Sequence, residues 1–189
     1  MLKKVAFFIA LLSLSATSFA RGFDIKLGNE VAELTYLTES STFGYGGADI
    51  GFGILFTEND DYQLNAKLMI SGNPAGNNKA FQFGVGGKLM FVDLDIANEE
   101  VGALALAGQM RYIIPSSTPI AFRIGAAFAP SITSFSGADA YGEYEAAVEI
   151  EVTPSAQAYL GYRKIQYDFE GGGKYILDDS VHVGIKFEF

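Results

Sequence analysis

The only histidine of the sequence, His182, lies two residues after Ser180. If this segment is a β-strand, both side chains point to the same face, because side chains alternate between faces with a period of two. A serine beside a histidine is the nucleophile and general base of an ester hydrolase, and Asp178 or Asp179 could orient the base. The alternative is that His182 fills space beside charged neighbours in a polar interior. Spacing alone does not bring a third group within hydrogen-bond reach, so we expect no catalysis and keep Ser180 and His182 as the candidate pair.

Charged residues recur at every second position of several other segments. An acidic ladder on one face could conduct cations or perform acid–base chemistry, but it could equally pair with basic residues across a shared interior. We expect ion pairs, with the excess of acid hydrated or altered in protonation, because an unpaired charge in a dry interior is costly. The ladder is Glu143, Glu145, Glu149 and Glu151. The polar residues expected in the interior are Lys67, Lys88, Arg111, Arg123, Glu149, Arg163, His182 and Lys186.

Other chemistry is disfavoured by composition. The sequence has no cysteine, which excludes thiol nucleophiles, redox pairs and cysteine-based zinc sites. A formal net charge of −9 without a basic stripe argues against nucleic acid as a partner. The runs "GVGGK" and "GGGK" lack the spacing of a phosphate-binding loop. Acidic loops such as "TENDD" could hold divalent cations, but more often such loops are simply solvated. We expect no metal site and no cofactor.

Period-two alternation runs through almost the whole chain after Ala20 and predicts strands with one apolar and one polar face. In "ADIGFGILFTE", for example, Ile50, Phe52 and Ile54 alternate with glycine and polar residues. Strand glycines on the polar face are expected to make room for long interior side chains. The ten predicted strands cover residues 23–27, 31–37, 48–58, 62–70, 81–91, 104–113, 120–128, 144–152, 156–163 and 181–189.

The first twenty residues have a different character. Two lysines precede an apolar run from Val5 to Leu12, and small residues follow it. These three zones are typical of a secretory signal peptide, and the run is too short to span a bilayer. We therefore predict a signal peptide over residues 1–20 and one β-barrel domain over residues 21–189.

Alternation alone does not say which face lies inside. A soluble barrel of the lipocalin type buries its apolar face, whereas a membrane barrel turns that face to lipid. Several strands alternate for ten or more residues, the length needed to cross a bilayer at a tilt. Aromatic residues are placed near strand ends, and the polar face carries mid-strand charges. These features favour the membrane barrel, with the soluble binding barrel as the alternative.

The chain ends on a strict alternation, "VHVGIKFEF". Its apolar positions resemble the C-terminal assembly signal of bacterial outer-membrane proteins, in which the last strand is recognised by the assembly machinery, plausibly by strand addition. These positions are Val183, Ile185, Phe187 and Phe189.

Further segments resemble the YfaZ family of small outer-membrane proteins. They are the run from Phe128 to Ser131, the Thr153-Pro154 turn, Gly161-Tyr162-Arg163, the strand "ALALAGQMRY", and the ending from Val183 to Phe189. The resemblance covers about the last 90 residues well and the first half only in pattern. It implies a small monomeric outer-membrane barrel of ill-defined role, and it carries over no catalytic residue.

The combined prediction is an all-β, antiparallel transmembrane barrel of ten strands in the outer membrane of a Gram-negative bacterium. Both termini are expected to face the periplasm. An eight-stranded barrel with residues 22–38 outside the wall is the alternative. Because so narrow a barrel is filled by side chains, we expect a structural or interaction role, or a narrow conduit, rather than enzymatic activity; the alternative is a lipid hydrolase using Ser180 and His182. The expected partners are outer-membrane lipids, lipopolysaccharide and the assembly machinery.

Overall fold

The computed structural model describes residues 20–40, 48–74, 80–94, 99–116, 118–169 and 172–189. Nearly all of these residues are in strands, as the alternation predicts. The strands are β1 (Ala20–Leu27), β2 (Val31–Ser40), β3 (Ala48–Thr57), β4 (Tyr62–Gly72), β5 (Phe81–Leu94), β6 (Glu99–Ile114), β7 (Ile120–Ala129), β8 (Ser134–Phe135), β9 (Ala138–Thr153), β10 (Ala156–Phe169) and β11 (Lys174–Glu188). A short 3₁₀ turn, η1 (Ser131–Thr133), precedes β8. No helix among the described residues is long and apolar enough to cross a membrane.

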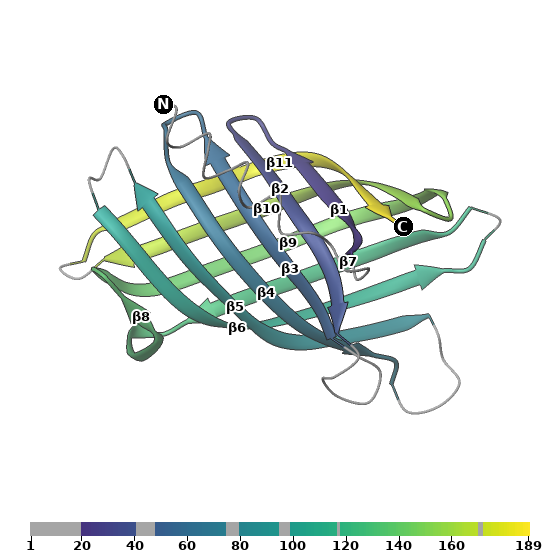
Figure 1. Ribbon diagram of the computed structural model, residues 1–189, viewed down its shortest axis with the longest axis horizontal. Helices are drawn as coiled ribbons and strands as arrows, with labels where there is room; N and C mark the ends of the chain where they lie inside the picture. Colours follow the sequence, from purple (N-terminus) through teal and green to yellow (C-terminus); the bar gives the residue numbers. More distant parts are fainter. Residues whose placement is uncertain (1–19, 41–47, 75–79, 95–98, 117, 170–171) are drawn as a thin grey trace.

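Ten of these strands form a closed antiparallel barrel. Consecutive strands pair along the chain, β5 pairs with β6, β7 pairs with β9, and β1 pairs with β11 to complete the ring. The seam between β1 and β11 runs from the pair Gly22 and Glu188 to the pair Leu27 and Val183. In Figure 1 the wall β2–β6 crosses in front of the wall β7–β11. The predicted ten-stranded barrel is confirmed, and the eight-stranded alternative is wrong, because β1 and β2 are both paired members of the wall.

The short strand β8 lies outside the ring and pairs only with Gly102 and Ala103 of β6, among the described residues. The sequence analysis did not foresee it. The Phe135 ring of β8 packs over Gly102 of β6. A Cβ atom at Gly102 would lie 2.0 Å from this ring, so the contact requires glycine. The same ring contacts Phe91 of β5, with centroids 5.7 Å apart. The connection from β7 to β9 therefore extends the wall beside β6, beyond the end of β7.

The outer wall is apolar. Large hydrophobic side chains that point outward are exposed on every strand of the ring, for example Phe52 on β3, Leu106 on β6 and Val183 on β11. On β10 and β11 this apolar surface is interrupted by charged residues towards the end of the barrel where β10 finishes and β11 begins, and beyond them Ile176 is again exposed. Outward positions change from aromatic or aliphatic at Tyr162 and Val181 to charged at the next outward residues, Lys164 and Asp179. A closed ring leaves no unpaired strand edge along the paired seam, which is the arrangement that hydrocarbon surroundings require.

The inside of the barrel is divided into two parts. We call the end where β1 begins and β11 finishes the termini end, and the opposite end the loop end. Towards the loop end the inward side chains are apolar, and we call this layer the apolar plug; it consists of Leu55, Met90, Val92, Leu94, Val101, Ala103, Tyr141, Ile165, Tyr167 and Leu177. Towards the middle and the termini end the inward side chains are mostly polar or charged.

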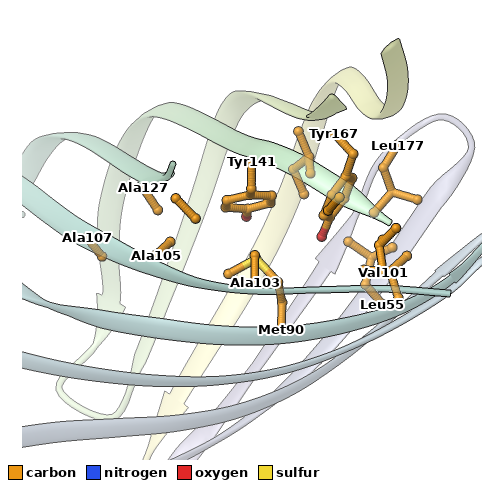
Figure 2. Packing of buried hydrophobic residues seen from close by; sticks show 14 of the residues in the cluster. Leu55, Met90, Val101, Ala103, Ala105, Ala107, Ala127, Tyr141, Tyr167 and Leu177 are labelled. Atoms are coloured by element: carbon orange, nitrogen blue, oxygen red, sulfur yellow. The ribbon is translucent and has the colours of Figure 1, made fainter. Parts of the chain in front are cut away.

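The plug fits together as large side chains against small ones. Alanines of β6 and β7 line one side, and Tyr141 and Tyr167 point from β9 and β10 into the space that they leave (Figure 2). The two tyrosine rings are in contact, with centroids 5.0 Å apart. Tyr167 donates a hydrogen bond of 2.8 Å to Gln63 Oε1 of β4, on the far wall. The plug thus reaches across the lumen and closes the loop end with side chains of the wall itself.

Candidate functional site

Arg163 on β10 is one of the most buried charged groups, with 1% of its surface exposed. Its Nε donates a 2.7 Å hydrogen bond to Asp178 Oδ2 on β11, and its Nη1 donates to Glu33 Oε2 on β2. Glu33 also accepts a 3.1 Å hydrogen bond from Asn65 on β4. One guanidinium therefore neutralises two carboxylates, and through Glu33 it connects the last strands to the first ones across the lumen.

A second contact crosses the lumen directly below the plug. Lys88 on β5 pairs with Glu143 on β9, with Nζ and Oε2 2.6 Å apart. The Tyr141 hydroxyl of the plug donates a hydrogen bond of 2.6 Å to the same carboxylate oxygen. The apolar plug and the charged layer are therefore joined at Glu143.

Glu145 is the centre of the next layer towards the termini end. Its carboxylate lies 2.9 Å from Lys26 Nζ on β1, 3.0 Å from Arg123 Nη1 on β7 and 3.3 Å from His182 Nε2 on β11. Tyr159 on β10 donates a 2.5 Å hydrogen bond to Asp24 on β1 nearby. These contacts tie β1 to β9 and β10 on the inside, where the backbone seam with β11 is short.

The layer nearest the termini end is formed along one side of the wall. Arg111 and Arg123 lie directly opposite each other on β6 and β7, a like-charged pair that is unfavourable by itself. Glu149 on β9 offsets it, accepting 2.6 Å and 2.5 Å hydrogen bonds from the two Nε atoms. Lys186 pairs with Glu188 at 2.6 Å, about one-third exposed. Lys67, opposite Lys88 on β4, has no ion pair to the described residues and is only partly buried.

The charged residues of the interior are arranged in ion pairs. Glu143, Glu145 and Glu149 of the acidic ladder each contact at least one cation. No cluster of three potential metal ligands is present among the described residues. A buried pair of this kind requires good geometry and additional hydrogen bonds to compensate for desolvation, and Glu33 and Glu143 have both. The arrangement can brace the barrel; it does not present a free carboxylate pair for acid–base work at these three positions.

The candidate hydrolase pair is not assembled. Ser180 and His182 do share one face of β11, but the Ser180 hydroxyl donates its hydrogen bond to Asp178 Oδ1 at 2.6 Å. His182 is 2% exposed, and neither ring nitrogen makes a hydrogen bond of normal geometry with the described residues. The imidazole packs edge-on against Tyr159 instead, with centroids 5.8 Å apart. A buried base that does not contact its nucleophile is the arrangement of a space-filling histidine.

Two glycines create the space for these rings. A Cβ at Gly161 would lie 2.6 Å from His182 Nε2, and a Cβ at Gly184 would lie 2.1 Å from the Tyr159 ring. Each ring lies across β10 and β11 from its glycine, since Gly161 pairs with His182 and Tyr159 with Gly184. Interior glycines therefore accommodate large neighbours, as the sequence analysis expects.

The last strand ends in an aromatic contact on the outer wall. Val183, Ile185, Phe187 and Phe189 are all exposed on this face. The Phe189 ring lies 6.0 Å from Phe23 of β1, and Phe23 lies 5.5 Å from Tyr36 of β2. The strand proposed as an assembly signal is thus also the strand that closes the barrel.

Several interior residues were missed by sequence reasoning. Tyr141, Tyr167 and the alanines of β6 and β7 carry no charge, so the alternation rule did not mark them as interior. A signal existed, however. Leu55 and Met90 are bulky and apolar at positions of the otherwise polar face, and both lie near the loop end of their strands.

Comparisons with known proteins include three weak structural likenesses and one family match. No curated protein matches the chain. Solved structures that resemble it include a bacterial polysaccharide outer membrane secretin (TM-score 0.47, 9% identity, 89% of this chain and 69% of that one). A second is the outer membrane channel DcaP of Acinetobacter baumannii (TM-score 0.41, 13% identity, 93% of this chain and 55% of that one). A third is the NanC porin (TM-score 0.45, 14% identity, 90% of this chain and 98% of that one). At these TM-scores none of them carries an argument about function.

The match to a family model, in contrast, extends over nearly the whole chain. The model described as "YfaZ precursor" covers residues 2–189, nearly the whole chain, including the first half in which the sequence resembles that family only in pattern. With its ten-stranded barrel, braced interior and closing last strand, the chain belongs to the YfaZ family.

Proposed function

We propose that this protein is an exported outer-membrane barrel whose lumen is closed to solutes, and that it acts as a structural or interaction protein rather than as a porin or an enzyme. The apolar outer wall and charged interior support the membrane location, because a soluble binding barrel has the reverse arrangement. The family description "precursor" agrees with removal of an N-terminal segment. Residues 1–19 of the expected signal peptide lie outside the described residues.

The observation that carries the closed lumen is the apolar plug. Leu55, Met90, Leu94, Ile165 and Tyr167 have no exposed surface at all. A constriction lined by apolar side chains excludes ions, because water does not wet it. The plug is made of side chains on the strands of the wall, so no loop can swing away to open it.

Conductance in planar lipid bilayers tests this proposal. We expect the unaltered protein to give no stable single-channel current, because ions would have to cross the plug. Tyr141→Ala with Tyr167→Ala removes the two rings that fill the lumen opposite the alanines, and we expect this double variant to conduct. Phe122→Ala, which shortens an outward ring of β7, is the matched control and should stay silent. A steady current through the unaltered protein would favour the narrow conduit over the closed barrel.

If a conduit exists, the charged layers near the termini end are where its selectivity would arise. Arg111 on β6 and Arg123 on β7 are partly exposed there, and both pair with the buried Glu149 on β9. Arg123→Gln or Glu149→Gln would then change the ratio of cation to anion current. A closed barrel shows no such effect in either variant.

A further inference from the structure

The outer wall has a hollow on β6, β7, β9 and β10. Its volume is about 740 Å³, within the range of about 300–1,000 Å³ typical of ligand pockets. Small outward residues form its floor, since Gly108 pairs with Ala126 and Ala146 lies beside them on β9. The larger side chains around it are Val85, Leu106, Met110, Ile124, Phe128, Tyr144 and Tyr162. The hollow is therefore apolar, and it exists because three small residues, Gly108, Ala126 and Ala146, leave space between larger side chains.

The rim of this hollow towards the loop end is polar. Lys164 lies directly opposite Tyr144, one of the surrounding residues, in the pairing of β10 with β9. Asp179 accepts a hydrogen bond from the Tyr162 hydroxyl and lies 3.3 Å from Lys164 Nζ. Lys164 and Asp179 are both more than one-third exposed. Since an ammonium group has three N–H donors, Lys164 can contact a second anion while keeping Asp179.

The position of the hollow limits what can occupy it. It lies in the apolar part of the wall, immediately below the level at which outward residues of β10 and β11 become charged. A molecule that fills the hollow needs a hydrocarbon part in contact with the wall, and a negatively charged group on it can contact the exposed Lys164 at the rim towards the loop end. Lys174 on β11 is a second cation towards the loop end; it is two-thirds exposed, and its Nζ lies 3.8 Å from Asp168 Oδ1. With both termini at the periplasm, this side faces the outer leaflet.

We propose that the hollow binds an acyl chain of the phosphorylated glycolipid lipid A, and that Lys164 binds one of its phosphates. This inference rests on the proposed outer-membrane location. It assigns a specific lipid site to one part of the wall, in place of uniform contact with lipid all around the barrel.

The test is lipid retention by the purified full-length protein in detergent. Delipidated protein is titrated with lipid A in mixed micelles, and bound lipid is counted by native mass spectrometry. Gly108→Leu with Ala126→Leu fills the floor, and we expect affinity to fall about tenfold or more, which corresponds to about 1.4 kcal/mol. Ala66→Leu makes the same change on the outer face of β4 and should leave affinity unchanged. A Cβ at Gly108 meets only Gly84 O at 3.9 Å, so the single Gly108→Ala variant serves if the larger change impairs folding.

The phosphate contact has its own comparison. Lys164→Gln should weaken lipid A binding by about tenfold, the usual loss for one charge-assisted hydrogen bond, and should not affect dephosphorylated lipid A. The control is Lys186→Gln, the same change at a residue that lies inside the barrel near the termini end. Equal binding of lipid A by the filled and unfilled proteins would overturn the site, and equal binding of lipid A and dephosphorylated lipid A by the unaltered protein would overturn the phosphate assignment. If the protein needs detergent to stay soluble but gives one of these two binding results, the lipid site is wrong while the proposed function is unaffected.

Discussion

At Arg163 one guanidinium neutralises Asp178 from the neighbouring strand and Glu33 from the other side of the lumen. Almost none of this side chain is exposed to solvent. Removing one partner of a buried ion pair is far more costly than removing an exposed one, because the remaining charge stays buried without compensation. The interior charges differ widely in this respect, and the difference can be measured.

Arg163→Met leaves Asp178 buried without its cation and leaves Glu33 with only Lys26, whose Nζ is 3.8 Å away. We expect it to lower the free energy of unfolding by about 3–5 kcal/mol, the usual cost of breaking a buried pair. Urea unfolding in lipid vesicles, followed by circular dichroism, measures the loss; the sequence has no tryptophan to serve as a fluorescent probe.

Lys186→Gln is the comparison for Arg163→Met. Its pair with Glu188 is about one-third exposed, and such pairs contribute about 0–1 kcal/mol. If the two variants lose equal stability, the interior charges do not act as braces.

Sequence reasoning reaches only part of this network. The alternation puts Arg163 on the polar face because the apolar Leu160 and Tyr162 occupy the other face of the same strand. Its partner Glu33, however, is 130 residues away. Which side chains meet inside a barrel depends on how far each strand is shifted against the next, and no local spacing records that shift.

At the scale of elements, the pair β10 and β11 places two aromatic rings over two glycines. Gly184→Ala forces a Cβ against the Tyr159 ring, and we expect a loss of about 1–3 kcal/mol from overpacking. Shortening the ring by Tyr159→Ala in the same protein should recover part of the loss, so a double-mutant cycle by urea unfolding gives a non-zero coupling energy. Gly72→Ala, whose Cβ meets nothing within 4 Å, should cost little. Strict additivity of the two changes would contradict the packing described for this strand pair.

The last strand is both the closing strand and the expected assembly signal. Phe189→Ala removes the ring that contacts Phe23 across the seam, and we expect the yield of folded protein in the outer membrane to fall several-fold. The shift in mobility between unheated and heated samples on denaturing gels reports the folded fraction. Phe91→Ala shortens an equally outward ring at the loop end and should assemble normally. Equal yields of the two variants would refute the role of the terminal residue.

The strands were predictable because alternation is a local property of the sequence. The apolar plug was not predictable, because it depends on which distant strands face one another across the lumen. A leucine such as Leu55 indicates lipid contact when hydrophobicity alone is considered. It lies inside because its neighbours along β3 fix the face, and because Tyr141 and Tyr167, supplied by strands far along the chain, fill the lumen at that level. The extra strand β8 was missed since two residues are too short to alternate.

The molecule as a whole is apolar outside, and its interior is charged except at the apolar plug. We therefore expect the mature protein to precipitate or aggregate in plain buffer and to become monodisperse when detergent or lipid is added. Size-exclusion chromatography with light scattering makes the comparison. A stable monomer in buffer without amphiphile would remove the basis for the membrane location and for the functions argued from it.

The contacts inside the barrel also have a consequence for incomplete chains. Asp24, Lys26 and Glu33 find partners 135, 119 and 130 residues later, on β9 and β10. Until the final third of the polypeptide is present, these charges lack these partners and the edge of β1 is not paired with β11. A chain truncated before that point keeps an open strand edge, which favours proteolysis and association with other strands, so the ring can close only when the whole of β11 is present.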